Sequence, residues 1–351
     1  MQADAIGLSA LLVSTSKQMP VCVQEQDTRG LQFPVLVGGA AINRDFGRRI
    51  SVLEGNRYFE PGLFYAKDAF EGLQVMETLT GDAAGREKFI AQAKREALAP
   101  RAPQRAASTN GAIQYSAVKS DLATVPKPPF FGPRVVGDID LATLWSCFDL
   151  RSLYRLSWGA ANTKGDAFEK LVKEEFEPRL RRYEALAASE PLLEPRFVYG
   201  YFPAAGTGND AIIYDPNDPA REIARFPFTR QAGGEHLSLA DYLREPENGR
   251  GVDVVALQIV TVGSRVSERI AELHAAGEYS ESYFLHGFSV QSAEALAEYA
   301  HRLIRKELGL PEDRGKRYSW GYGACPELSQ HEIAFRLLDA TNAIGDRKSV
   351  V

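Results

Sequence analysis

The chain has 351 residues, of which 44% are hydrophobic and 25% are charged, with a formal net charge of −5, and a chain of this length holds about two domains, each with its own core. The negative charge and the lack of a basic cluster free of acids exclude a typical nucleic-acid-binding protein, because phosphate binding needs a concentrated positive surface. The sequence has no run of about 18 apolar residues and no basic signal-peptide start, so we expect a cytoplasmic protein that does not bind membranes.

The first 80 residues alternate between strand and helix patterns. Apolar runs at 4–11, 33–41 and 62–66 predict strands, and the segments 14–30 and 68 onward predict helices. This order, with apolar strands, is typical of a parallel sheet covered on both faces. Three strands are few for an independent domain, so residues 1–80 are predicted to be part of a flavodoxin-like (Rossmann-like) α/β unit.

Residues 81–135 are rich in Ala, Arg, Lys and Pro. Such a segment buries too little apolar surface to fold alone, so it is predicted to be a linker with a helical first part. Phe130 and Phe131, near its end, are expected to dock it onto a folded domain.

Residues 136–351 are predicted to form an α+β domain. The apolar stripe over 168–183 predicts a long amphipathic helix, and a further helix is predicted from 292 to 308. Short strand-like runs separated by turn residues predict an antiparallel sheet. These runs are 197–202, 211–214 and 252–260.

The three cysteines, Cys22, Cys147 and Cys325, lie far apart and form no CxxC zinc pattern. We therefore expect no metal site in the chain. Cys325 is expected to be a small packing residue of its loop.

The segment Arg317-Tyr-Ser-Trp-Gly-Tyr-Gly-Ala-Cys-Pro326 combines three chemical features. An arginine can grip a carboxylate with two hydrogen bonds, a glycine lets the backbone approach a ligand, and a tyrosine can cover it. The segment resembles the S-adenosylmethionine-binding loop, Arg-x-x-x-Gly-Tyr-Pro-Ala-Cys-Pro, in the reactivation domain of cobalamin-dependent methionine synthase. Gly323 stands where this family has proline. The alternative is an ordinary surface loop.

The resemblance covers most of residues 138–345 and implies further contacts to S-adenosylmethionine. It assigns Asp149 and Glu294 as acidic contacts and includes Ser319 and Tyr322 in the site, all as binding residues and none as a catalytic acid or base. A zwitterionic sulfonium needs an arginine for its carboxylate and acids for its ammonium or ribose hydroxyls. Which acid takes which group stays open. From spacing alone, Glu294 could be a solvated glutamate and Asp149 a helix cap.

Three segments of the first unit, Ser9-Ala-Leu11, Val37-Gly-Gly-Ala-Ala41 and Tyr65-Ala-Lys-Asp-Ala69, resemble the end of the family's cobalamin-binding domain. The resemblance implies that they line the slot for the nucleotide tail of cobalamin. A serine hydroxyl can hydrogen-bond such a tail, and glycines permit its close approach at the carboxyl ends of the strands. The alternative is a plain flavodoxin-like turn. The residues assigned to cobalamin are Ser9, Leu11, Gly38, Gly39, Tyr65 and Ala69.

The family ligates cobalt through the histidine of an Asp-x-His-x-x-Gly loop, and no histidine of this chain fits that pattern. The methyl-cap, folate and zinc–homocysteine regions of the family are not found either, so zinc is expected only in an upstream part of a parent protein. We expect missing N-terminal modules, or a partner chain, to carry the cobalt-ligating histidine. Because the family continues beyond Gly345 into further strands, we expect a C-terminally truncated fragment.

The resemblance implies a cytoplasmic methyltransferase that makes methionine from homocysteine, with methyltetrahydrofolate as donor and methylcobalamin as carrier. The part present implies the repair step, in which S-adenosylmethionine remethylates cob(II)alamin with an electron from a flavodoxin-type reductant. This fragment alone is expected to be inactive in methionine formation. Two alternatives stay open: a stand-alone reactivation subunit of a split enzyme, and a non-enzymatic corrinoid-binding protein.

Overall fold

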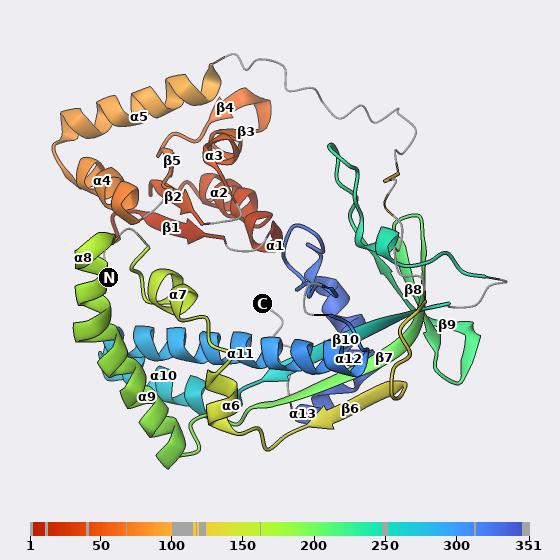
Figure 1. Ribbon diagram of the computed structural model, residues 1–351. Coiled ribbons are helices and arrows are strands. Elements are labelled where there is room, and N and C mark those ends of the chain that lie inside the picture. The colour runs from red at the N-terminus through yellow and green to blue at the C-terminus, as the bar shows by residue number, and fades with distance from the viewer. Residues whose placement is uncertain are drawn as a thin grey trace. The chain divides into compact units, whose positions relative to one another are not determined.

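The chain forms two compact units, whose elements are labelled in Figure 1. Unit 1 comprises Met1–Ser116, Thr229–Ser238 and Tyr318–Ser329. Unit 2 comprises Ala117–Phe228, Leu239–Arg317 and Gln330–Val351. The computed structural model describes residues 3–10, 13–39, 42–67, 69–99, 115–116, 118, 124–161, 163–247, 252–311 and 314–345.

Unit 1 is built on a three-stranded parallel sheet with the order β1-β2-β5. The strands are β1 (Ile6–Ser9), β2 (Val35–Gly38) and β5 (Leu63–Tyr65). Each lies within a run that the sequence predicted, and the parallel pairing is confirmed. The remaining elements are α1 (Val13–Ser16), α2 (Met19–Thr28), α3 (Arg44–Ile50), β3 (Val52–Leu53), η1 (Glu54–Asn56), β4 (Arg57–Tyr58), α4 (Ala69–Thr80) and α5 (Ala83–Leu98).

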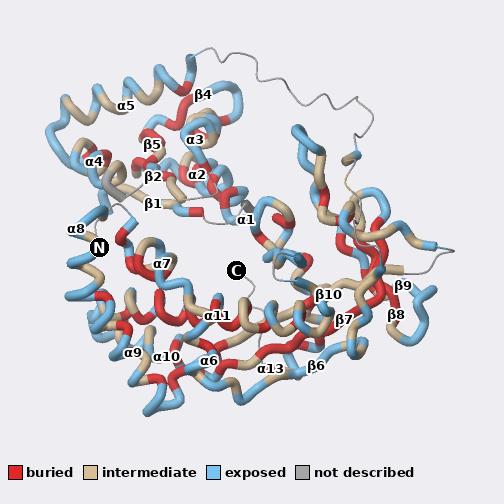
Figure 2. The backbone as a smooth tube through the Cα atoms, viewed as in Figure 1, coloured by how far each residue is buried: buried red, intermediate tan, exposed pale blue. Residues whose placement is uncertain are grey.

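The two faces of this sheet pack against different side chains, as its alternating pattern requires. Val35 and Val37 belong to one buried cluster with Val23 of α2. Phe64 points to the other face and stacks on Phe89 of α5, with 4.7 Å between ring centroids. Helix α5 is thus the helical first part predicted for the linker, and it packs on unit 1. Figure 2 shows the buried residues concentrated on the strands and the inner sides of the helices.

Unit 2 joins an antiparallel sheet to a set of helices, as predicted. The sheet has the order β10-β7-β8-β9, and β6 also pairs with β7. Its strands are β6 (Gly132–Val136), β7 (Arg196–Thr207), β8 (Asp210–Asp215), β9 (Asp218–Pro227) and β10 (Asp253–Thr261). The helical elements are α6 (Leu141–Trp145), α7 (Leu150–Ser152), the π-helical turn η2 (Leu153–Ser157), α8 (Gly165–Leu171), the π-helical turn η3 (Val172–Phe176), α9 (Glu177–Ser189), η4 (Leu239–Tyr242), α10 (Arg265–Ala275), α11 (Tyr279–Glu307), η5 (Leu328–Gln330, at the border of the two units), α12 (His331–Leu338) and α13 (Ala340–Ile344).

Helix α11 lies along the sheet and supplies much of the core of unit 2. Its Phe288, Leu296 and Ile304 are buried in one cluster with Phe197 and Tyr199 of β7. The cluster also includes residues of α9 and of η2, so the long helix is held from several sides. This packing fixes the face of α11 that carries Glu294.

Three sequence expectations need correction in unit 2. The predicted linker to residue 135 already contains most of β6, because this short segment gains its hydrogen bonds by pairing with β7. Gly200 makes that pairing possible, since an added Cβ would lie 2.5 Å from the Gly132 carbonyl oxygen. Helix α11 begins at Tyr279 rather than at 292, and strand β9 was not predicted.

The docking role of the linker end is confirmed for one phenylalanine and wrong for the other. The ring of Phe130 contacts those of Tyr199 and Tyr201, with centroids 5.5 and 5.1 Å apart. Phe131 is 47% exposed and does not dock.

Among the helices that the structure describes, none is long and apolar enough to cross a membrane.

Candidate functional site

Arg317 and Glu294, both predicted to bind S-adenosylmethionine, meet in unit 2. The Nη2 atom of Arg317 donates to Oε2 of Glu294 over 3.2 Å. Glu294 lies on α11, and Arg317 lies 23 residues further along the chain, at the start of the predicted loop. The side chain of Arg317 is 27% exposed and that of Glu294 is 54% exposed, so the ion pair is accessible to a ligand.

A cavity of about 280 Å³ opens beside Arg317 at the C-terminal end of α11. Its wall is strongly cationic, with Arg305, Arg314 and Lys316 next to Arg317 and with Glu298 as the one acid among the described lining residues. Sequence reasoning missed this cavity, because its basic residues are divided between the end of a helix and the segment that follows it and form no specific pattern.

His301 forms part of the same wall. Its Nε2 lies 2.8 Å from the Gly315 carbonyl oxygen. Burial lowers the pKa of His301, and the positive charges of Arg305 and Arg317 act in the same direction. The hydrogen bond to Gly315 and the negative charge of Glu298 oppose this lowering of the pKa.

Asp149, the other acid assigned to the ligand, has a local structural role. Its Oδ1 accepts from the Ser152 backbone N–H at 3.1 Å, and its Oδ2 accepts from the Ser152 hydroxyl at 2.6 Å. These bonds cap α7 and hold the pKa of Asp149 below its usual value, with the Ser152 hydroxyl as the largest cause. The helix-cap interpretation is therefore confirmed. The described hydrogen bonds of Asp149 do not join it to Arg317.

The rest of the predicted loop, including Ser319 and Tyr322, belongs to unit 1. The turn is closed by the Gly321 N–H donating to the Cys325 carbonyl oxygen at 2.8 Å and by the Cys325 thiol donating to the Ser319 carbonyl oxygen at 3.0 Å. Cys325 is buried, and burial raises the pKa of its thiol to about 11. Cys325 is thus a packing residue, as expected. Ser319 and Tyr322 are exposed.

Three residues assigned to cobalamin, namely Ser9, Gly38 and Tyr65, lie together at the carboxyl edge of the parallel sheet in unit 1. Ser9 is the register partner of Gly38, and Val37 is the partner of Tyr65 on the next strand. Ser9 is exposed, and Tyr65 is partly buried. Ala69 begins α4, just after this edge. Leu11 lies outside the described residues.

Gly38 and Gly39 are required by the chain itself. An added Cβ on Gly38 would lie 2.9 Å from the Ala66 carbonyl oxygen, and one on Gly39 would lie 2.3 Å from the Ala10 carbonyl oxygen. Gly39 also has φ +106, which side-chain-bearing residues rarely adopt. The plain structural turn, the alternative weighed for these residues, explains both glycines without a ligand.

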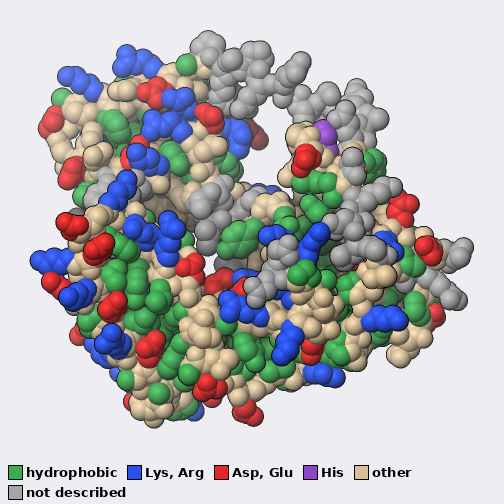
Figure 3. Space-filling model, in the orientation of Figure 1, with side chains coloured by type: hydrophobic (Ala, Val, Ile, Leu, Met, Phe, Trp, Pro, Cys, Tyr) green, Lys and Arg blue, Asp and Glu red, His purple; other side chains and the backbone are tan. Residues whose placement is uncertain are grey.

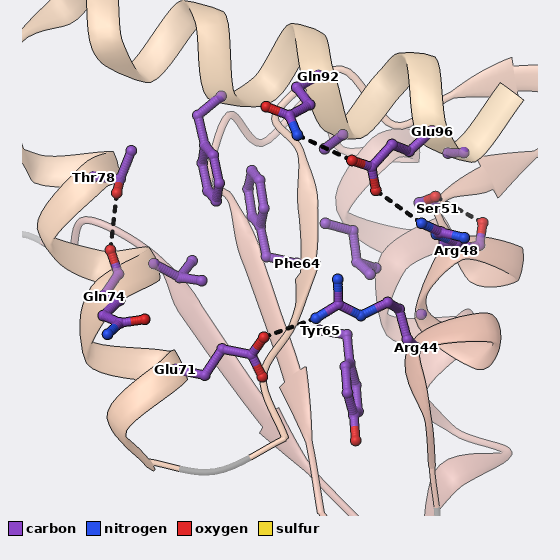
Figure 4. Close-up of a pocket in the computed structure, with 16 residues that line it drawn as sticks. Arg44, Arg48, Ser51, Phe64, Tyr65, Glu71, Gln74, Thr78, Gln92 and Glu96 are labelled. Atoms are coloured by element: carbon purple, nitrogen blue, oxygen red, sulfur yellow. Dashed lines mark hydrogen bonds and ion pairs between the residues drawn. The ribbon is translucent and has the colours of Figure 1, made fainter. Parts of the chain in front are cut away.

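A second cavity in unit 1, of about 370 Å³, was not predicted. Figure 4 shows it between α3, α4, α5 and β5. Arg44 pairs with Glu71 at 2.8 Å, and Arg48 pairs with Glu96 at 2.9 Å, above a floor that includes Phe64. The charges at its rim are already paired, so this cavity offers no unbalanced charge to a ligand.

Within the described ranges, no group of three or more His, Cys, Asp and Glu side chains is placed to hold a metal ion.

Comparison with known proteins identifies the family. The model of the activation domain of vitamin B12-dependent methionine synthase matches residues 134–347. The methionine synthases of Mycobacterium tuberculosis and Mycobacterium leprae are 35% and 34% identical to the chain over 96% of its length. The chain spans only 32% and 31% of the length of these relatives. The chain belongs to the family of vitamin B12-dependent methionine synthase activation domains.

The fold of a solved structure agrees with this assignment. A crystal structure of the MetH reactivation domain bound to AdoHcy is 22% identical in sequence, with a TM-score of 0.55. The match covers 65% of this chain and 76% of the solved one. At this identity the likeness establishes the shared fold.

Proposed function

We propose that this chain is the reactivation part of a cobalamin-dependent methionine synthase. In this proposal it binds S-adenosylmethionine and serves the reductive remethylation of cob(II)alamin. The parent protein makes methionine from homocysteine, with methyltetrahydrofolate as methyl donor. The observation that carries the proposal is the contact between Arg317 and Glu294, two residues that the resemblance assigns to one ligand and that lie within the segment matched by the family model.

The residues present fit S-adenosylmethionine. Arg317 offers parallel N–H groups to a carboxylate, and Glu294 offers a carboxylate to an ammonium group or to ribose hydroxyls. Asp149 is a weaker candidate because Ser152 occupies both of its oxygens. Ser319 and Tyr322 are exposed and so accessible to a ligand. These residues bind and orient the ligand and do not exchange protons with it.

The strand ends of unit 1 fit the nucleotide tail of cobalamin. The exposed Ser9 hydroxyl lies beside Gly38, which leaves the strand end without a side chain. In the proposed arrangement, residues 1–80 are the end of a flavodoxin-like cobalamin-binding domain, 81–135 are the linker, and the reactivation domain starts at 136. When bound, cobalamin supplies the methyl acceptor after reduction, and S-adenosylmethionine supplies the methyl group.

The proposed partners are a flavodoxin-type reductant and the protein part that carries the cobalt-ligating histidine. Basic and acidic side chains intermix on the face seen in Figure 3, which supports the view that nucleic acid is not a partner. A cytoplasmic location belongs to the same proposal. Two alternatives, a stand-alone reactivation subunit and a corrinoid carrier, can be separated by the ultraviolet-visible spectrum of added cobalamin. A carrier must bind the corrinoid by itself and should change this spectrum, whereas a stand-alone subunit needs a partner chain that carries the cobalt-ligating histidine.

Calorimetric titration with S-adenosylmethionine tests the proposal. Arg317→Ala should weaken binding roughly tenfold or more, because it removes a charge-assisted contact worth about 1.5 to 3 kcal/mol. Arg269→Ala is the matched control, since Arg269 is an exposed arginine that pairs with Glu272 on its own helix α10, and it should leave the affinity unchanged. Equal affinities of the Arg317→Ala variant and the unaltered protein would refute the assignment of Arg317.

A further inference from the structure

The two residues proposed to hold the ends of the amino-acid group already hold each other. Arg317 donates one hydrogen bond to Glu294 at 3.2 Å, and both side chains remain partly exposed. A zwitterionic α-amino acid carries a carboxylate and an ammonium group on the same carbon. It therefore presents the same two charges as this ion pair, in one small group.

Glu294 has no basic neighbour on its own helix. The positions three and four residues away on α11 are Val290, Gln291, Ala297 and Glu298, and these are the positions that meet Glu294 on a helix surface. Its cation therefore comes from Arg317, outside the helix. Glu298, one turn later, is different, because Arg302 of the same helix pairs with it at 2.9 Å.

Arg317 stands in a strongly positive environment. Arg305, Arg314 and Lys316 share the wall of the adjacent cavity with it, against one acid, Glu298, among the described lining residues. Removing Glu294 from Arg317 without a replacement would take a negative charge away from a wall with more basic than acidic side chains, which is unfavourable. A ligand can therefore displace Glu294 at low cost only if it brings its own carboxylate.

We propose that the Arg317–Glu294 ion pair is a placeholder that a zwitterionic amino-acid ligand exchanges. The ligand's carboxylate replaces Glu294 on Arg317, and the released Glu294 takes the ligand's ammonium group. One ion pair becomes two, so an α-amino acid gains more than a ligand with one charge. Glu294 thereby selects for ligands with both groups. This inference rests on the proposed function, because it takes S-adenosylmethionine as the natural ligand.

The test uses calorimetry with S-adenosylhomocysteine and two analogues, one with hydrogen in place of the ammonium group and one with hydrogen in place of the carboxylate. S-Adenosylhomocysteine has the same amino-acid group as S-adenosylmethionine. For the unaltered protein, both analogues should bind at least about tenfold more weakly than S-adenosylhomocysteine, since each loses a charge-assisted contact. The analogue without a carboxylate should be the weakest, because it cannot displace Glu294.

Glu294→Gln and Glu294→Ala should change the two carboxylate-bearing ligands in opposite directions. S-Adenosylhomocysteine should lose about tenfold in affinity, because its ammonium group loses a partner. The analogue without the ammonium group should gain about two- to fivefold, because Arg317 no longer has to leave an exposed ion pair. Glu272→Gln, which alters an exposed glutamate of α10 paired with Arg269 of the same helix, is the matched control and should change neither affinity by more than about twofold.

The opposite signs separate exchange from a fixed contact. If Glu294 only contacted the ammonium group, the analogue without that group would bind the Glu294 variants and the unaltered protein equally well, and the inference would be wrong. If Glu294 only supported the fold, both ligands would bind the variants more weakly, with the same consequence. If the unaltered protein bound no S-adenosylhomocysteine and no S-adenosylmethionine, the proposed function itself would fail.

Discussion

Gly287 of α11 lies directly against the indole ring of Trp158. An added Cβ at this position would stand 2.7 Å from Cδ1 and 2.8 Å from Nε1 of the tryptophan. The same Nε1 donates to the Phe284 carbonyl oxygen at 3.0 Å, one turn earlier on α11. The long helix reaches this close approach only because residue 287 has no side chain, and the contact holds the helix that presents Glu294.

Gly287→Ala should therefore destabilise unit 2, although alanine favours helix formation over glycine by about 1 kcal/mol. Trp158 is buried among other rings and has little room to move, so overpacking should cost about 1 to 3 kcal/mol. Urea unfolding followed by circular dichroism measures the loss. Gly137→Ala is the control, because a Cβ there meets nothing within 4 Å. Equal unfolding free energies for Gly287→Ala and the unaltered protein would show that the contact is not restrictive.

A buried pair of tyrosines predicts a loss of stability at high pH. Tyr199 and Tyr201 donate their hydroxyls to the Glu307 carboxylate at 3.0 and 2.7 Å. Burial, and then these hydrogen bonds, raise the pKa of Tyr199 to about 12, and the pKa of Tyr201 is raised for the same reasons. The unfolded chain ionises its tyrosines near pH 10 while the folded chain keeps these protons, so stability should fall as the pH rises from about 10 to 12.

The comparison is between unfolding free energies at pH 9 and pH 11. Tyr201→Phe should show a smaller fall over this range than the unaltered protein, because one raised pKa is gone. Tyr242→Phe, which alters a ring that is 48% exposed, should show the same fall as the unaltered protein. An identical fall in the Tyr201→Phe variant would mean that Tyr201 does not contribute.

The strands of unit 1 were predictable because each is a short apolar run bounded by turn residues, as in buried parallel strands. Strand β9 was not, because most of Asp218–Pro227 is exposed and its charged residues do not alternate regularly with apolar ones. It becomes a strand by pairing with β8, which is a tertiary effect that its own residues do not encode. The first half of α11 was missed because aromatic residues and Gly287 lower its helix propensity, and packing against Trp158 outweighs this.

The candidate site was also predictable only in part from the sequence. Arg317 and Glu294 were assigned to the same ligand from a loop motif and from a match on a helix, and the structure adds a hydrogen bond between them. The cationic cavity beside them was not anticipated, because Arg305 and Lys316 lie on a helix end and a loop and have no periodic relation. The capping role of Asp149 was one of two interpretations left open by the sequence, and its contacts with Ser152 show the cap without testing the ligand contact.

Substitutions of Asp149 should separate its cap from any ligand contact. Asp149→Ala removes the acceptor for the Ser152 N–H and should destabilise unit 2 by about 0.5 to 2 kcal/mol. Asp149→Asn keeps an acceptor oxygen, so its stability should stay close to that of the unaltered protein. Thermal unfolding measures both variants. If Asp149→Asn weakens S-adenosylmethionine binding while the stability is retained, the charge serves the ligand. If the affinity is unchanged, Asp149 is a cap alone.

Cobalamin bound by this chain should be held without a protein imidazole on cobalt. The first histidine in the sequence is His236, so none lies on the strands that carry Ser9 and Gly38. His236 itself places Nδ1 3.2 Å from the Gln231 carbonyl oxygen in a separate segment of unit 1. Electron paramagnetic resonance of the cob(II)alamin complex should give the same spectrum with nitrogen-14 and nitrogen-15 histidine. A cobalt splitting that changes on labelling would show that a histidine is a ligand and that the missing Asp-x-His-x-x-Gly loop has a substitute in this chain.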